Sequence, residues 1–378
     1  MEGNRDRRVS QGTDDQFFAL LRSGLWNEVP ALAPFACGVN WEALYKLASA
    51  QTVTPLVTDG INRLPKEFLP KDPERMDPFL CDLMATAKRN RLLDGFIPKL
   101  FGALAGIPVL LVKGQSLAQD YPEPERRQPG DIDLLLLPAS YEAAKAALLP
   151  KATDVLEEEK EILHQGMHFG SIEVEIHGSI STLMSRKLDR KLAALLEEEF
   201  RNGTFPSVPI GGKDVPVPSA DFNAVYVFVH FLHHYWAGGV GLRQLVDWMT
   251  FISVHKRDIH PVLLEKRLDD LGLLRVWKVF TGFAQEYLGC PAEKLPLAAA
   301  PDAGKNARIW RYVRYCGNFG KNVDRSRKKE TYLVRKIHSF WRLVVADRLR
   351  HFPVFPRASV RLFFGAFGYG LQRLAKGE

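Results

Sequence analysis

Segments with strand-like patterns occupy one short part of this chain, and helical patterns lie on both sides of it. Short apolar runs and an alternating segment follow one another between residues 107 and 177. Residues 15–105 and the chain after Arg186 instead show the spacing of amphipathic helices. This order of elements predicts an α+β fold, in which a small mixed β-sheet has flanking helices and is followed by a mostly helical C-terminal domain.

The expected elements can be placed by residue. The predicted strands are Ile107–Lys113, Asp131–Leu137 and Ile172–His177, with shorter ones near residues 154 and 167. The predicted helices are Phe79–Leu104, Tyr141–Leu149, one from Ser219 to a stop at Gly238-Gly239, Leu242–His255, Pro261–Leu271 and Leu274–Leu288. Residues 206–218 are interpreted as a proline-rich linker. The chain is therefore divided into an N-terminal helical segment (1–88), an α/β core (89–204) and a helical C-terminal domain (219–378).

Composition favours a globular intracellular protein. The chain has 378 residues, of which 46% are hydrophobic and 25% charged, so it can bury a large core without disulfides. Its four cysteines lie far apart and form no paired metal-ligand spacing, so we expect reduced thiols. The polar N-terminus shows no secretory signal, and no apolar stretch is long enough to cross a bilayer. We predict a cytoplasmic protein with no transmembrane segment.

Positive charge is concentrated near the C-terminus. The formal net charge is +7, and residues 305–350 are dense in Lys and Arg. A basic face can attract a nucleic acid, a nucleoside triphosphate or an anionic membrane, but we favour the simpler interpretation of a solvated helical surface.

A pair of acids at the start of one predicted strand is the strongest candidate for chemistry. Asp131 and Asp133 are two residues apart, so in a strand both side chains point to the same face. Carboxylates placed in this way can share two magnesium ions, which prefer oxygen ligands and leave room for substrate phosphates. An Asp-x-Asp pair also occurs at ordinary strand edges, so its neighbours decide the interpretation.

Three neighbouring features favour a phosphate site. Lys113-Gly114-Gln115-Ser116 is a strand followed by a turn and a helix, where glycine and backbone amides can approach an anion. Arg126-Arg127 precedes the acids and can meet phosphate charge. Either Glu173 or Glu175 can supply a third carboxylate, and we choose Glu175 because apolar residues flank it and His177 follows.

These motifs together resemble a known family. The run from Val112-Lys-Gly-Gln-Ser-Leu-Ala through Tyr121-Pro to Arg127-Gln-Pro-Gly-Asp-Ile-Asp-Leu-Leu135 is similar to the uncharacterised nucleotidyltransferase family of the DNA polymerase beta-like superfamily. The later segments Val174-Glu-Ile-His177, His230-Phe-Leu-His-His234 and Leu242-Arg-Gln-Leu-Val-Asp247 extend the similarity over roughly residues 15–370. The most specific motifs lie between Lys113 and His177.

The resemblance implies an activity and assigns roles to residues. It implies transfer of a nucleoside monophosphate from a triphosphate to a hydroxyl acceptor, a small molecule, protein or RNA, with two Mg²⁺ ions, or Mn²⁺ in their place. Asp131, Asp133 and Glu175 would bind the metal and act in catalysis. The nucleotide-binding residues would be Lys113, Gly114, Ser116 and Arg127, and the candidate acceptor contacts are His177, His230 and His234. The superfamily usually has Gly-Ser or Gly-Gly at the turn, whereas this chain has Gly114-Gln115-Ser116.

Two other functions stay open at this point. The altered turn is compatible with a catalytically weak or inactive nucleotide-binding protein of the same fold. His230 and His234 are four residues apart on one helix face, a spacing that can bind zinc in a hydrolase, with Asp247 as a third ligand. A metalloprotease motif needs glutamate after the first histidine, where this chain has Phe231, and packing of a helical core explains the same histidines.

Overall fold

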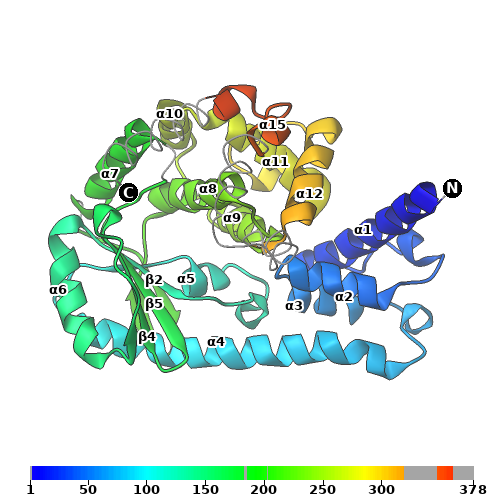
Figure 1. Ribbon diagram of the computed structural model, residues 1–378, viewed down its shortest axis with the longest axis horizontal. Coiled ribbons are helices and arrows are strands. Elements are labelled where there is room, and N and C mark those ends of the chain that lie inside the picture. Colours follow the sequence, from blue (N-terminus) through cyan, green and yellow to red (C-terminus); the bar gives the residue numbers. More distant parts are fainter. Residues whose placement is uncertain (1, 183–184, 202, 319–346, 361–378) are drawn as a thin grey trace, which may run out of the picture. The chain divides into compact units, whose positions relative to one another are not determined.

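The computed structural model describes residues 2–182, 185–201, 203–318 and 347–360 (Figure 1). Their contacts group the chain into two compact units. The first unit is formed by residues 1–177, 205–218 and 287–289, and the second by residues 178–204, 219–286 and 290–378. Within the described ranges, no helix combines the length and the apolar character needed to cross a bilayer. The division into segments 1–88, 89–204 and 219–378 stays a prediction.

A five-stranded mixed sheet forms the centre of the first unit. Its strands are β1 (Leu110–Val112), β2 (Ile132–Leu135), β3 (Asp154–Val155), β4 (His164–Phe169) and β5 (Ile172–His177), in the spatial order β1-β2-β5-β4-β3. β2 and β5 run parallel, and the other neighbouring strands run antiparallel. The α+β prediction is therefore confirmed, although β1 and β2 are shorter than the apolar runs that predicted them.

One face of this sheet is the hydrophobic core of the unit. Helices α4 (Asp77–Ala103) and α6 (Pro138–Leu148) pack against it (Figure 1). The core contains alternate strand residues together with apolar residues of both helices: Ile132, Leu134, Val174, Ile176, Leu93, Ile97, Leu100, Tyr141 and Leu148. Each fully buried side chain of this size contributes about 1.5–3 kcal/mol. Because side chains alternate between the two faces along a strand, Asp133, Glu175 and His177 point to the opposite face.

The linker predicted over residues 206–218 is wrong. This segment forms a hairpin of β6 (Ser207–Ile210) and β7 (Lys213–Pro216), which is tied to the sheet's unit through contacts with β1 and α4. Proline is tolerated here because a two-stranded ribbon leaves many amides outside its ladder. The turn lies against α4 at Gly211, where φ is +58° and an added Cβ would be 2.1 Å from the Asp94 carbonyl oxygen. Only glycine fits that position.

The remaining helices of the first unit lie mostly before the sheet. They are α1 (Glu2–Trp26), α2 (Trp41–Ala50), α3 (Thr54–Ile61) and the short α5 (Gly114–Ala118). α2 begins at Trp41 within the stretch expected to be helical, and Asn40 caps it by accepting a hydrogen bond from the Ala43 amide at 3.0 Å.

Helices make up most of the chain after the sheet. They are α7 (Arg186–Arg201), α8 (Ala220–Ala237), α9 (Leu242–Val254), α10 (Pro261–Leu271), α11 (Leu274–Leu288), α12 (Ala303–Cys316) and α15 (Asp347–His351). The predicted bounds of α10 and α11 are confirmed, and α8 begins after Ser219 and ends at Gly238 as expected. The expected basic stretch at 305–350 lies largely outside the described residues, because these omit 319–346.

Candidate functional site

Strand pairing brings the three predicted acids together. β2 and β5 are parallel neighbours in a register that places Asp133 beside Glu175, and Asp131 lies two residues before Asp133. One carboxylate oxygen from each acid lies within 4.8 Å of one from each of the others. The Asp133 side chain is only 3% exposed, whereas that of Glu175 is 21% exposed. Glu173, the other candidate for the third acid, lies across from His168 and is not among the grouped side chains of the described residues.

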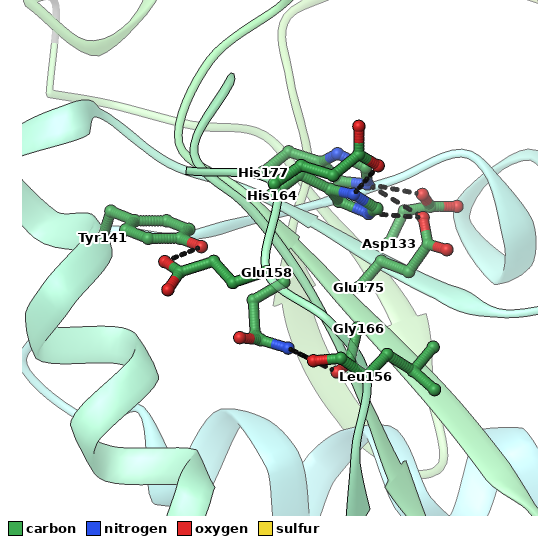
Figure 2. Close-up of polar contacts among 10 residues, drawn as sticks. Asp133, Tyr141, Leu156, Glu158, His164, Gly166, Glu175 and His177 are labelled. Carbon is green, nitrogen blue, oxygen red and sulfur yellow. Dashed lines mark hydrogen bonds and ion pairs between the residues drawn. The ribbon is translucent and has the colours of Figure 1, made fainter. Parts of the chain in front are cut away.

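Three basic side chains contact the acids, and Figure 2 shows two of them, His164 and His177, beside Asp133 and Glu175. The ammonium group of Lys113, at the end of β1, forms an ion pair with Oδ1 of Asp133. Nε2 of His177 lies 2.9 Å from the same Oδ1 and 3.4 Å from Oε2 of Glu175. Nε2 of His164 lies 3.2 Å from that Oε2. The site is therefore a compact group of carboxyl groups and basic side chains on one face of the sheet.

The three carboxyl groups differ in the direction in which their surroundings shift the pKa. The charge of Asp133, together with burial, raises the pKa of Asp131 to about 6. Burial alone would raise the pKa of Asp133, but Lys113 and His177 hold it below its ordinary value. Burial also opposes ionisation of Glu175, yet His164 and His177 lower its pKa. All three acids are thus ionised above about pH 6, and their mutual repulsion makes the site attractive to a cation.

The turn after β1 is held tightly against the acids. Lys113 has φ +54° and ψ −151°, an uncommon conformation for a residue other than glycine, which costs about 1–3 kcal/mol. Gly114 follows with φ +43°, and an added Cβ there would lie 3.3 Å from the Asp131 carbonyl oxygen. The Ser116 hydroxyl donates to the Lys113 carbonyl at 2.7 Å, and Gln115 Nε2 donates to Asp94 Oδ1 at 2.7 Å. Both polar side chains of the turn therefore have intramolecular partners.

The arginine pair lies in a loop with defined partners. Arg126 Nε is 2.8 Å from Oδ2 of Asp59 in α3. The side chain of Arg127 is buried, and its backbone carbonyl accepts a hydrogen bond from Nδ2 of Asn90 in α4 at 2.9 Å. Asn90 also donates to the Glu125 carbonyl at 3.1 Å and so fixes the loop that leads into β2. Nucleotide contacts by Arg127, Lys113, Gly114 and Ser116 stay predictions.

Sequence reasoning missed His164, which belongs to the same cluster. β4 and β5 form a hairpin in which Phe169 lies across from Ile172 and His164 across from His177. The signal was present, because Gly170-Ser171 between two alternating segments is typical of a two-residue hairpin turn, and counting back from it pairs the two histidines.

The other two histidines named as acceptor contacts lie in the second unit. His230 and His234 are on α8, with their Nε2 atoms 3.2 Å apart, and Nδ1 of the nearby His233 lies 2.8 Å from the Thr182 carbonyl. Among the described residues, two groups of side chains lie close enough together to hold a metal ion: Asp131 with Asp133 and Glu175, and His164 with Glu175 and His177. Neither group contains an α8 histidine. The acceptor-contact role of His177, His230 and His234 stays a prediction.

Comparison with known proteins identifies the chain at the level of a family. No curated protein and no solved structure matches it. The family described as "uncharacterised nucleotidyltransferase" matches residues 38–289, a span that includes the glycine turn, all three acids and α8. The resemblance inferred from the motifs between Lys113 and His177 is confirmed: this chain belongs to the uncharacterised nucleotidyltransferase family.

Proposed function

We propose that the protein is a metal-dependent nucleotidyltransferase, which moves a nucleoside monophosphate from a nucleoside triphosphate to a hydroxyl acceptor and releases pyrophosphate. The observation that carries the proposal is the convergence of Asp131, Asp133 and Glu175, with carboxylate oxygens within 4.8 Å of one another, in a chain of a nucleotidyltransferase family. The acceptor is a small molecule, a protein or RNA.

The donor chemistry of the acidic cluster fits magnesium. All three side chains offer carboxylate oxygens, which are the ligands that Mg²⁺ and Mn²⁺ prefer. The charge of Asp133, together with burial, raises the pKa of Asp131 to about 6, and a divalent cation bound here would offset the repulsion between the two acids. Asp131, Asp133 and Glu175 would hold the metal, which when bound offsets triphosphate charge and polarises the α-phosphate.

The other roles in the reaction would belong to residues of the chain. In the reaction the acceptor oxygen bonds to the α-phosphorus, the bond from that phosphorus to the β-phosphate oxygen breaks, and pyrophosphate leaves with the electron pair. Glu175 is our choice to receive the acceptor proton, because its side chain is 21% exposed whereas Asp133 is 3% exposed and inaccessible to an acceptor. Lys113 supplies fixed positive charge beside the acids, and the turn at Gly114 passes close to the backbone of Asp131.

The experiment is a transfer assay with an α-phosphate-labelled nucleoside triphosphate, Mg²⁺ and cell lysate as the source of acceptors. Asp131→Asn and Asp133→Asn are each expected to lower transfer by at least about 10²-fold, because both remove a metal ligand. Glu173→Gln is the matched control, since Glu173 lies on the same strand and face as Glu175 but outside the cluster. Transfer retained in either aspartate variant, with circular dichroism unchanged, would contradict the assignment.

A nucleotide-binding protein without transfer activity is the second candidate. It is favoured by the turn itself, where Ser116 already donates to the Lys113 carbonyl and Gln115 to Asp94, so that neither side chain is free to bind phosphate without rearrangement. Nucleotide-dependent thermal stabilisation with Mg²⁺, combined with no pyrophosphate release over a broad set of acceptors, would favour this second function over the first.

A further inference from the structure

We propose that His164, Glu175 and His177 form a second metal site on this sheet face, selective for a divalent transition-metal ion such as Mn²⁺, Co²⁺ or Zn²⁺. The site shares Glu175 with the acidic cluster, but it does not depend on nucleotidyl transfer being the activity.

Three ligand atoms converge at this place. His164 and His177 are directly opposite one another on antiparallel strands, and their rings are stacked with centroids 4.7 Å apart and planes 15° apart. Nε2 of each ring points toward the same Glu175 oxygen, at 3.2 Å for His164 and 3.4 Å for His177 (Figure 2). One ligand atom from each of the three residues lies within 4.8 Å of the others. Two imidazoles and one carboxylate are a common ligand set for a divalent metal.

The second observation is the state of the His164 ring. Its Nε2 is buried and makes no hydrogen bond of acceptable geometry with any described residue, although the Glu175 oxygen is only 3.2 Å away. A buried ring nitrogen without a hydrogen bond lowers the stability of the fold unless another group bonds to it. A metal ion between Nε2 and the Glu175 carboxylate would supply that partner.

The opposite nitrogen of the same ring is arranged as in metal-binding histidines. Nδ1 of His164 lies 3.2 Å from Oε1 of Glu159, which precedes β4. Histidines that ligate metals usually donate their second ring N–H to a carboxylate, which fixes the tautomer and leaves the other nitrogen available to the ion. Glu159 is therefore assigned as the positioning residue for His164.

The ligand types distinguish this site from the acidic cluster. Imidazole nitrogen favours transition-metal ions, whereas a set of carboxylate oxygens suits Mg²⁺. Three protein ligands leave coordination positions for water or substrate. Because Glu175 belongs to both groups, occupancy of one site is expected to change the metal affinity of the other.

The test uses the full-length protein after removal of metals with EDTA. It is titrated with Co²⁺, followed by visible absorption, and loaded with Mn²⁺ for pulsed EPR, which detects coupling of the ion to imidazole nitrogen. The wild type is expected to show this nitrogen coupling. His164→Ala should weaken Co²⁺ binding at least about tenfold, by loss of one of three ligands, and should reduce the nitrogen coupling.

Two variants serve as controls. His168→Ala removes a histidine from the same strand and the same face, four residues further along and outside the group, and should leave both signals unchanged. Asp131→Asn should abolish nucleotidyl transfer and keep the nitrogen coupling. The transfer assay therefore tests the proposed function, and the nitrogen coupling separately tests the second metal site.

A second variant of the same site, His177→Gln, keeps the test valid if His164→Ala does not fold. It should likewise weaken Co²⁺ binding. Absence of nitrogen coupling in the wild type would overturn the proposal. Coupling and Co²⁺ affinity unchanged in folded His164→Ala and His177→Gln proteins would overturn it equally.

Discussion

Replacement of Asp131 by asparagine is expected to stabilise the metal-free protein, although it removes a residue of the candidate site. The pKa of Asp131 is raised from 3.8 to about 6, mainly by the charge of Asp133 and then by burial. An acid whose pKa is higher in the folded protein than in the unfolded chain destabilises the fold once it is ionised. The gap from 3.8 to about 6 corresponds to about 3 kcal/mol, at about 1.4 kcal/mol for each pH unit.

The pH range in which this effect appears follows from the same two values. Between about pH 4 and pH 6, the folded protein keeps a proton that the unfolded chain has released, so this contribution to stability falls as the pH rises. Above about pH 6 the destabilisation is constant, and below about pH 4 it is absent. Asp131→Asn removes a charge that repels Asp133, so the variant should be more stable than the wild type above pH 6.

Urea denaturation in EDTA, repeated from pH 5 to pH 8, measures the difference in unfolding free energy between the two proteins. The difference should grow toward about 3 kcal/mol as the pH rises. Glu173→Gln provides the control and should show no such dependence, because Glu173 lies outside the acidic cluster. A difference that is the same at every pH, or an Asp131→Asn protein that is less stable at pH 8, would refute this reasoning. Saturating Mg²⁺ should narrow the difference by stabilising the wild type.

Three further substitutions test other parts of the structure. Gly211→Ala should destabilise the fold by about 2 kcal/mol or more in urea denaturation, because its φ is +58° and the new Cβ would meet the Asp94 carbonyl; an unchanged midpoint would contradict the hairpin's placement. Asn90→Ala removes two hydrogen bonds to the loop before β2 and should cost about 1–3 kcal/mol by the same measurement, with Lys88→Ala, an exposed neighbour, as control. Lys113→Met removes the ion partner of Asp133 and should lower transfer in the labelled-nucleotide assay by at least about tenfold, whereas Lys151→Met, far along the chain on the surface, should not.

The elements that local patterns determine were predictable from the sequence. Asp131 and Asp133 share a face because strand side chains alternate, and that follows from their spacing alone. The bounds of α10 and α11 follow from Pro261 at one helix start and from Gly272 between the two helices, where φ is +70°. Elements with local signals of this kind can be predicted without knowing the rest of the fold.

What could not be predicted depends on pairing between distant segments. The flanking residues favour Glu175 over Glu173, but its position beside Asp133 rests on the parallel register of β2 and β5. Sequence spacing does not reveal that register, because Asp133 and Glu175 are 42 positions apart. The prolines in residues 206–218 predict a linker, because the alternation of apolar residues there is too short to indicate strands. The structure instead has the hairpin at 207–216. The partners of Gln115 and Arg126 are likewise side chains of other helices.

Helix α4 gives the site a property that none of the site residues has alone. Asn90 and Asp94 are one helical turn apart, and one holds the loop that enters β2 while the other holds the turn that leaves β1. The segments that lead out of β1 and into β2 are therefore both anchored to a single turn of α4. Because both anchors belong to the same helical turn, a displacement of that turn would move the two segments together relative to the acids.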